Sequence, residues 1–146
     1  MSATTAENTN NKLVTNYDTN KLLLWNNRTI EADYTNDGYD VTLAAGTVMG
    51  RVAATSKVIP LESDASDGSQ YPIGVLCEET EVAEGDDAVL TLCVSGDVNE
   101  NLLVFTKSGD DLDTVISGKT LRDRIGSDTV GIMLKAGAEQ TTVDNQ

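Results

Sequence analysis

No histidine occurs among the 146 residues, and this absence removes most of the catalytic arrangements that proteins use near neutral pH. Ser-His and Cys-His nucleophiles, histidine-containing zinc sites and the commonest general base all need an imidazole. The two cysteines, Cys77 and Cys93, cannot close a structural zinc site by themselves. We therefore expect no catalytic residue, no cofactor and no metal centre, and the chain is not predicted to be an enzyme.

Two short stretches resemble ligand-binding motifs but lack essential residues. Residues 118–120 match the end of a phosphate-binding loop, yet Asp113 stands where the loop requires its first glycine. Residues 64–68 loosely match a calcium loop, but Ser66 replaces a carboxylate and no bidentate glutamate follows at the expected distance. Neither nucleotide nor calcium binding is predicted, and the paired carboxylates elsewhere are interpreted as solvated charges in turns.

The two cysteines are predicted to be buried free thiols. If residues 73–78 and 88–94 pair as a hairpin with Ile73 opposite Cys93, the sulfurs of Cys77 and Cys93 lie four strand positions apart. That separation is roughly 13 Å at the usual rise per residue. A disulfide needs Cα atoms within about 7 Å, so this register excludes one.

Charge and composition limit the partners. The net charge is −14, from 24 acidic and 10 basic residues, and such a surface repels phosphate backbones. We therefore expect no nucleic-acid ligand. The longest apolar runs are far below the roughly 18 residues that span a bilayer, and the first residues lack the features of a signal peptide, so no membrane association is expected. Two cysteines are typical of a protein made in a reducing cytoplasm.

Turn signals recur at hairpin spacing from Arg28 onward, which predicts an all-β sandwich or small barrel. In residues 88–94 apolar side chains occupy both alternating faces, so this strand is expected to be covered on both sides. Pro60 and Pro72 fit only strand ends or edges.

The last third of the chain carries a helical signal. Leu112, Val115 and Ile116 follow i, i+3, i+4 spacing, which predicts one or two short helices within residues 110–128. Residues 130–134 are predicted to form a closing strand, and residues 136–146 a polar C-terminal tail.

Residues 1–27 are rich in asparagine and are expected to form an extended N-terminal arm that precedes a β-rich domain over residues 28–146. An apolar cluster interrupts the arm: Leu22, Leu23, Leu24 and Trp25. Two interpretations stay open. The cluster is either the first strand of the domain, packed on its own core, or an anchor that docks on a partner by adding a strand to a sheet edge.

Three pieces of the chain combine apolar strands with glycine turns. They are AGTVMGRV (residues 45–52) followed by KVIPLES, then DGSQYPIGVL (67–76), and LTLCVSGDVNENLLVF (90–105), the last interpreted as a strand, a glycine turn and a further strand. In this order and spacing they resemble the core of the bacteriophage head decoration proteins of the lambda head protein D type. The residues expected to set the turns and strand kinks of this core are Gly46, Gly50, Gly68, Pro72, Gly74 and Gly96.

The resemblance implies a β-tulip-like fold, a compact all-β body with little helix. It also implies a homotrimer that binds the major capsid protein on the outer surface of an icosahedral phage capsid and stabilises the expanded shell. The location would be the virion, after synthesis in the host cytoplasm. The N-terminal arm would become ordered on the capsid, with Leu22–Trp25 as docking residues. A head-fibre base or a host-surface adhesion module on the virion is the alternative.

Overall fold

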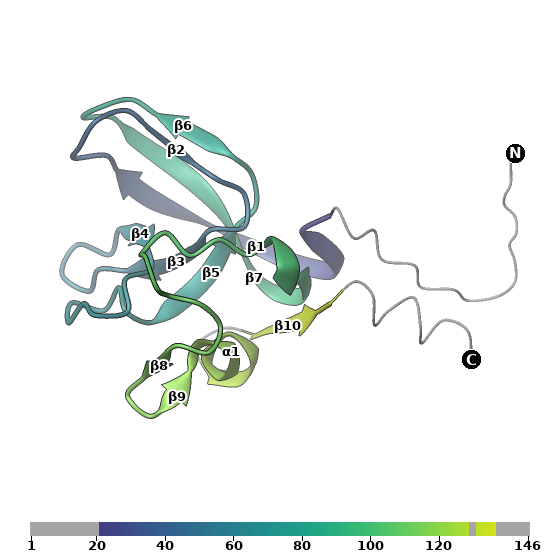
Figure 1. The fold of residues 1–146 in the computed structure, drawn as a ribbon. Coiled ribbons are helices and arrows are strands. Elements are labelled where there is room, and N and C mark those ends of the chain that lie inside the picture. Colours follow the sequence, from purple (N-terminus) through teal and green to yellow (C-terminus); the bar gives the residue numbers. More distant parts are fainter. Residues whose placement is uncertain (1–20, 129–130, 137–146) are drawn as a thin grey trace, which may run out of the picture.

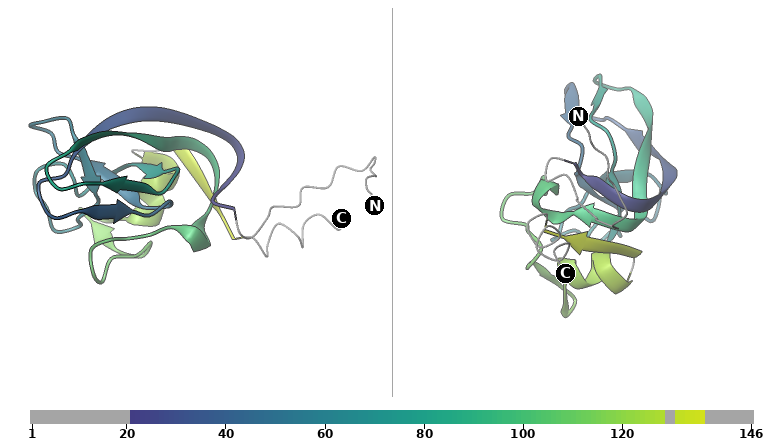
Figure 2. Two further views of the ribbon diagram at one scale, coloured as in Figure 1. Left: turned by 90° about the horizontal axis from the view of Figure 1, so that it is seen from above. Right: turned by 90° about the vertical axis from the view of Figure 1, so that its right-hand side faces the viewer.

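Strands dominate the computed structural model, which describes residues 21–128 and 131–136 (Figure 1). Two long strands, β1 (Leu23–Thr35) and β7 (Asp87–Asn99), run side by side as a curved pair (Figure 2). The shorter elements are β2 (Val41–Leu43), β3 (Val48–Arg51), β4 (Val58–Pro60), β5 (Pro72–Leu76), β6 (Thr80–Val82), a 3₁₀ turn (Glu100–Leu102), β8 (Val115–Ile116), β9 (Lys119–Thr120), α1 (Leu121–Asp123), a π turn (Arg124–Asp128) and β10 (Gly131–Lys135). The predicted all-β class is confirmed, with 49% strand and 8% helix. No helix in these ranges is long and apolar enough to cross a bilayer.

Strand β7 is the centre of the main sheet. Within the described residues this sheet has six strands in the order β1-β7-β5-β3-β4, and β10 also pairs with β7. All pairings are antiparallel except that of β10, which runs parallel to the end of β7. Two smaller two-stranded sheets, β2-β6 and β8-β9, accompany it. One strand therefore contacts the beginning, the middle and the end of the described chain.

The main sheet is covered on both faces at its centre. Consecutive residues of the same strand are divided between two buried clusters: Val48 and Met49 in β3, Val75 and Leu76 in β5, and Leu92 and Cys93 in β7. Because neighbouring strand residues point to opposite faces, the two clusters lie on the two sides of the sheet. Leu43 of β2 and Val82 of β6 complete one cluster. Leu121 of α1 and Ile125 of the π turn complete the other.

The prediction that residues 88–94 are covered on both sides is correct in the middle of the segment and wrong at its start. Leu90 is 1% exposed, whereas Val89 is 62% exposed. Strand β5 pairs with β7 only at Val75 and Leu76, so it does not extend to Val89. On β1 the residue opposite Val89 is the exposed Asp33, which leaves this face of the pair in water.

The predicted pairing of β5 with β7 is confirmed, but its register was wrong by two residues. Cys93 lies opposite Val75, and the backbone N–H of Cys77 donates to the Thr91 carbonyl at 3.0 Å. The physical reason is that residues 80–82 form β6 and pair with β2 instead of closing a simple hairpin. Both thiols are free, as predicted, but only Cys93 is fully buried, and the two cysteines are diagonal neighbours.

The short helix predicted within residues 110–128 is confirmed, but it does not include the residues that carried the helical signal. Val115 and Ile116 form β8, in which Ile116 is buried and Val115 is 61% exposed. The short helical turns begin only at Leu121, where the Thr120 hydroxyl accepts a hydrogen bond from the Asp123 N–H and caps the first turn. Alternation across a strand therefore explains this apolar pattern better than helical spacing. The predicted closing strand is confirmed as β10.

The residues expected to set turns serve in several ways. Gly46 and Gly68 have positive φ in turns, Pro72 begins β5, and Gly50 and Gly74 lie inside strands against neighbouring backbone; Pro60 ends β4. Gly96 was wrongly expected to end a strand. It lies inside β7 with φ +98°, and a Cβ there would be 2.5 Å from the Asn26 carbonyl oxygen. It allows β7 to continue past an irregularity in β1.

We predict that Gly50→Ala destabilises the fold by about 3 kcal/mol, because its Cβ would lie 2.2 Å from the Ser69 carbonyl oxygen and the backbone must move. Gly38→Ala is the matched control, since its nearest neighbour would be the Asn36 side-chain oxygen at 3.9 Å. Denaturant unfolding of both variants measures the difference. Equal stability of the two variants would contradict this packing.

Candidate functional site

The apolar cluster before residue 28 is split between core and solvent. Leu22 and Leu23 pack against the buried cluster around Val98, whereas Trp25 is 65% exposed. The Leu22 carbonyl accepts a hydrogen bond from the Asn99 N–H at 2.9 Å, so the segment is joined to the end of β7. Leu22 and Leu23 therefore fit the interpretation of the cluster as the first strand of the domain, packed on its own core. Trp25 points away from the core.

The expected boundary between arm and domain falls inside β1, which begins at Leu23 and runs on past residue 27. Residues 1–20 of the expected arm lie outside the described residues, as does most of the expected polar tail. Leu24 is half-buried. The candidate docking residues thus belong to the start of the main sheet.

A β-bulge holds Trp25 in its exposed position. The register of β1 against β7 shifts on both sides of Trp25, and Asn26 has φ +52°. The Asn27 side-chain amide donates to the Asp97 carbonyl at 3.0 Å and to the Ser95 carbonyl at 3.4 Å. These hydrogen bonds join the bulge to β7, so Trp25 is presented by a fixed backbone and not by a loose chain end.

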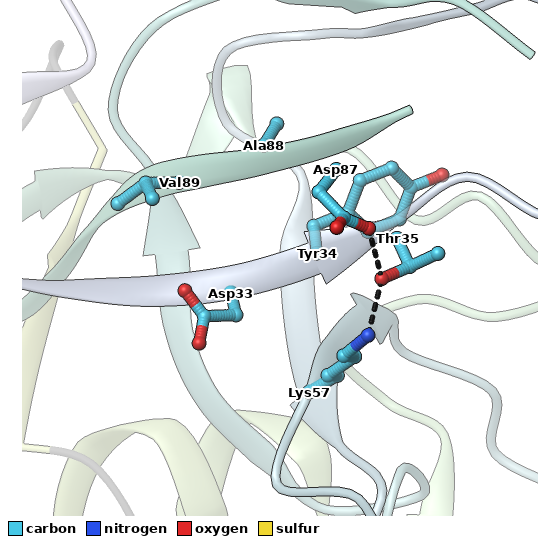
Figure 3. Close-up of a pocket in the computed structure, with 7 residues that line it drawn as sticks. All are labelled: Asp33, Tyr34, Thr35, Lys57, Asp87, Ala88 and Val89. Carbon is cyan, nitrogen blue, oxygen red and sulfur yellow. Dashed lines mark hydrogen bonds between the residues drawn. The ribbon is translucent and has the colours of Figure 1, made fainter. Parts of the chain in front are cut away.

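A second cluster of polar side chains lies at the other end of the β1-β7 pair (Figure 3). Lys57 Nζ donates to the Thr35 hydroxyl at 2.5 Å, and that hydroxyl donates to the Asp87 carboxylate at 2.7 Å. Burial, with a smaller contribution from Asp37, raises the pKa of the neighbouring Tyr34 phenol. The chain of hydrogen bonds ties the residue before β4 to both long strands, and its groups are engaged with one another in a structural link.

Sequence reasoning missed this cluster because only the folded chain brings Lys57 to Thr35, 22 residues earlier. In residues 21–128 and 131–136, no three histidine, cysteine or carboxylate side chains are grouped so that they could hold a metal ion.

The two thiols lie in an apolar environment that disfavours the thiolate. Burial, assisted by the neighbouring Cys93 and Glu78, raises the pKa of the Cys77 thiol to about 11. Burial also raises the pKa of Cys93, whose Sγ donates to the Ser95 carbonyl at 3.2 Å. Since the thiolate is the nucleophile, the raised pKa values lower the reactivity of both thiols near neutral pH.

Comparison with protein families gave a match to Bacteriophage lambda head decoration protein D over residues 4–117, which is more than half of the chain. The chain belongs to this family. Comparison with curated proteins gave no match. The family is structural, so the decoration protein has a structural role in the phage capsid and is located in the virion. The match ends before β9, so α1 and β10 of the decoration protein lie beyond it.

The raised Cys77 pKa predicts a pH-dependent stability. An unfolded thiol ionises near pH 9, whereas folded Cys77 keeps its proton until about pH 11. Its contribution is therefore complete below pH 9 and is lost as the pH rises through 11. We expect the free energy of unfolding to fall over this window, and to fall less in Cys77→Ala. An identical pH profile in both proteins would contradict the assignment.

Trp25 is the chain's one tryptophan, so its fluorescence reports on this position alone. With 65% of the residue exposed, we expect red-shifted emission and efficient quenching by acrylamide in the free decoration protein. Unfolding in guanidinium should change the quenching constant by less than about two-fold, as the ring is already in water. Blue-shifted, protected emission from the free protein would show that Trp25 is covered.

Proposed function

We propose that the decoration protein binds the outer surface of an icosahedral phage capsid as a homotrimer, contacts the major capsid protein and stabilises the expanded shell. Membership of the head decoration family is the observation that carries this proposal. The rigid β body supports it, because a cement protein needs a fixed platform and no bond chemistry. The start of β1 supplies the docking residues, Leu22–Trp25, with Trp25 as the exposed contact.

The N-terminal segment and the trimer act together in this proposal. Residues 1–20 end five positions before the exposed Trp25, so contacts made by this segment and by Trp25 would add within one subunit. Three linked copies bind with an effective concentration far above that of free subunits, so weak individual contacts give tight attachment. Subunits that bridge neighbouring capsid proteins then oppose the outward pressure of packaged DNA.

The charge of the chain suits an outward position. A net charge of −14 opposes contact with the packaged genome, and the acidic exterior keeps copies in solution before assembly. Binding to the shell then has to come from local surface features that differ from the acidic character of the chain as a whole. The exposed apolar surface at Trp25 is such a feature.

The proposal is tested by adding the purified full-length chain to undecorated, expanded capsids. We expect saturable binding, density near the three-fold positions of the shell and a higher temperature of capsid disruption. Mass measurement of the free protein should give three chains. Failure to bind, or binding without any change in disruption temperature, would overturn the stabilising role.

Deleting residues 2–20 tests the arm. We expect the shortened chain to keep its thermal unfolding temperature, because β1 begins at Leu23, and to bind capsids on the order of 100-fold more weakly. A capsid co-sedimentation titration measures the affinity. A variant in which the asparagines of residues 8–20 are replaced by glutamine serves as the control of equal length. Unchanged binding by the shortened chain would contradict the arm's role.

A further inference from the structure

The closing strand places a second exposed apolar side chain beside Trp25. In the register of β1 on β7, Trp25 lies opposite Asp97. In the register of β10 on the other edge of β7, Met133 lies opposite the same Asp97. Directly opposed residues of neighbouring strands project to the same face of a sheet, so all three share one face. At usual strand spacing the backbones at Trp25 and Met133 are about 10 Å apart, within reach of two long side chains.

Both side chains are exposed where their neighbours are buried. Trp25 is 65% and Met133 is 56% exposed. By contrast, Val98 and Ile132, which follow Asp97 and precede Met133, are fully buried on the opposite side. The three-stranded end of the sheet therefore has an apolar inner face fixed in the core and an apolar pair held on its outer face. We call this pair the Trp25–Met133 patch.

We propose that the Trp25–Met133 patch is a single docking surface for an apolar segment of the major capsid protein. This inference rests on the proposed function and extends its site to β10, which the family match does not cover. A large aromatic ring is the side chain that most often dominates interface energetics, and methionine adapts its shape to the partner.

The charges around the patch indicate the chemistry of the partner. Lys21 precedes β1, Arg28 lies opposite Ser95, and Lys135 lies two residues beyond Met133. Asp97 lies between Trp25 and Met133 on the same face, so the patch also has a carboxylate at its centre. An apolar capsid segment with a hydrogen-bond donor or a cation opposite Asp97 would complement this surface.

The ends of the chain also point to the capsid as the occupant. The beginning of β1 and the end of β10 lie at the same end of the molecule (Figures 1 and 2). Twenty residues precede Lys21 and ten follow Ala136. A partner bound to the N-terminal segment is therefore brought against the patch, and the patch adds a preformed contact whose backbone is already ordered.

The test uses the full-length chain and undecorated capsids, with Met133→Ala, Trp25→Ala and the double variant. Val115→Ala is the matched control, because Val115 is 61% exposed and lies on β8, outside the patch. We expect Met133→Ala to weaken capsid binding by about ten-fold with an unchanged unfolding temperature, and Val115→Ala to bind like the natural chain. Met133→Glu should weaken binding further, since it would add a second carboxylate next to Asp97 within an apolar contact.

The two substitutions should be coupled. If both side chains contact one capsid segment, the loss in the double variant differs from the product of the single losses by more than about two-fold. Normal binding by Met133→Ala, while deletion of residues 2–20 abolishes binding, would overturn the patch and leave the proposed function standing. Loss of the trimer in Met133→Ala would make the patch a subunit contact and also overturn it. Absence of binding by the natural chain would instead refute the proposed function.

Discussion

The pairing of β7 with three other strands is the constraint on which the rest of the structure depends. At Leu92 and Cys93 it is held between β1 and β5, and from Ser95 onward it is held between β1 and β10. Gly96 lets one continuous strand serve both halves, because a side chain at that position would collide with the β1 backbone at Asn26. Without this continuity β10 and the start of β1 could not pair with the same strand.

The same strand pairing also holds the exposed face at the end of the sheet in a fixed position. Leu23 and Val98 anchor the inner face of the sheet end, and Asn27 hydrogen-bonds across the bulge, so the outer face is rigid. A rigid apolar surface loses little entropy when a partner covers it, which favours strong binding by a small protein. The polar link of Lys57 and Asp87 secures the other end of the long strands.

Local backbone rules predicted much of this fold from the sequence. Pro72 begins a strand and Gly68 occupies a turn with positive φ. Both positions could be predicted because the proline ring and the missing glycine side chain restrict or free the backbone of a single residue. Pairing between strands far apart in the chain was harder to predict from the sequence. The register of Cys77 depends on β6 leaving to pair with β2, and an apolar spacing at Val115 that fits a helix belongs to a strand.

In the candidate site, too, local features could be predicted from the sequence and long-range neighbours could not. The apolar run Leu22–Trp25 could be identified from composition alone. Which of its side chains enter the core depends on the bulge at Trp25, and no local sequence pattern predicts that bulge. Met133 carried no signal at all in the sequence. Its relevance comes from sharing Asp97 with Trp25 as a cross-strand neighbour, a relation that joins residues more than a hundred positions apart.

A near-atomic electron cryomicroscopy reconstruction of capsids decorated with the full-length chain tests the central claim most directly. The account predicts trimeric density on the outer shell, with the start of β1 and β10 facing the major capsid protein and the Trp25 ring covered. Density in which that end faces solvent and the Trp25 ring is uncovered would contradict it.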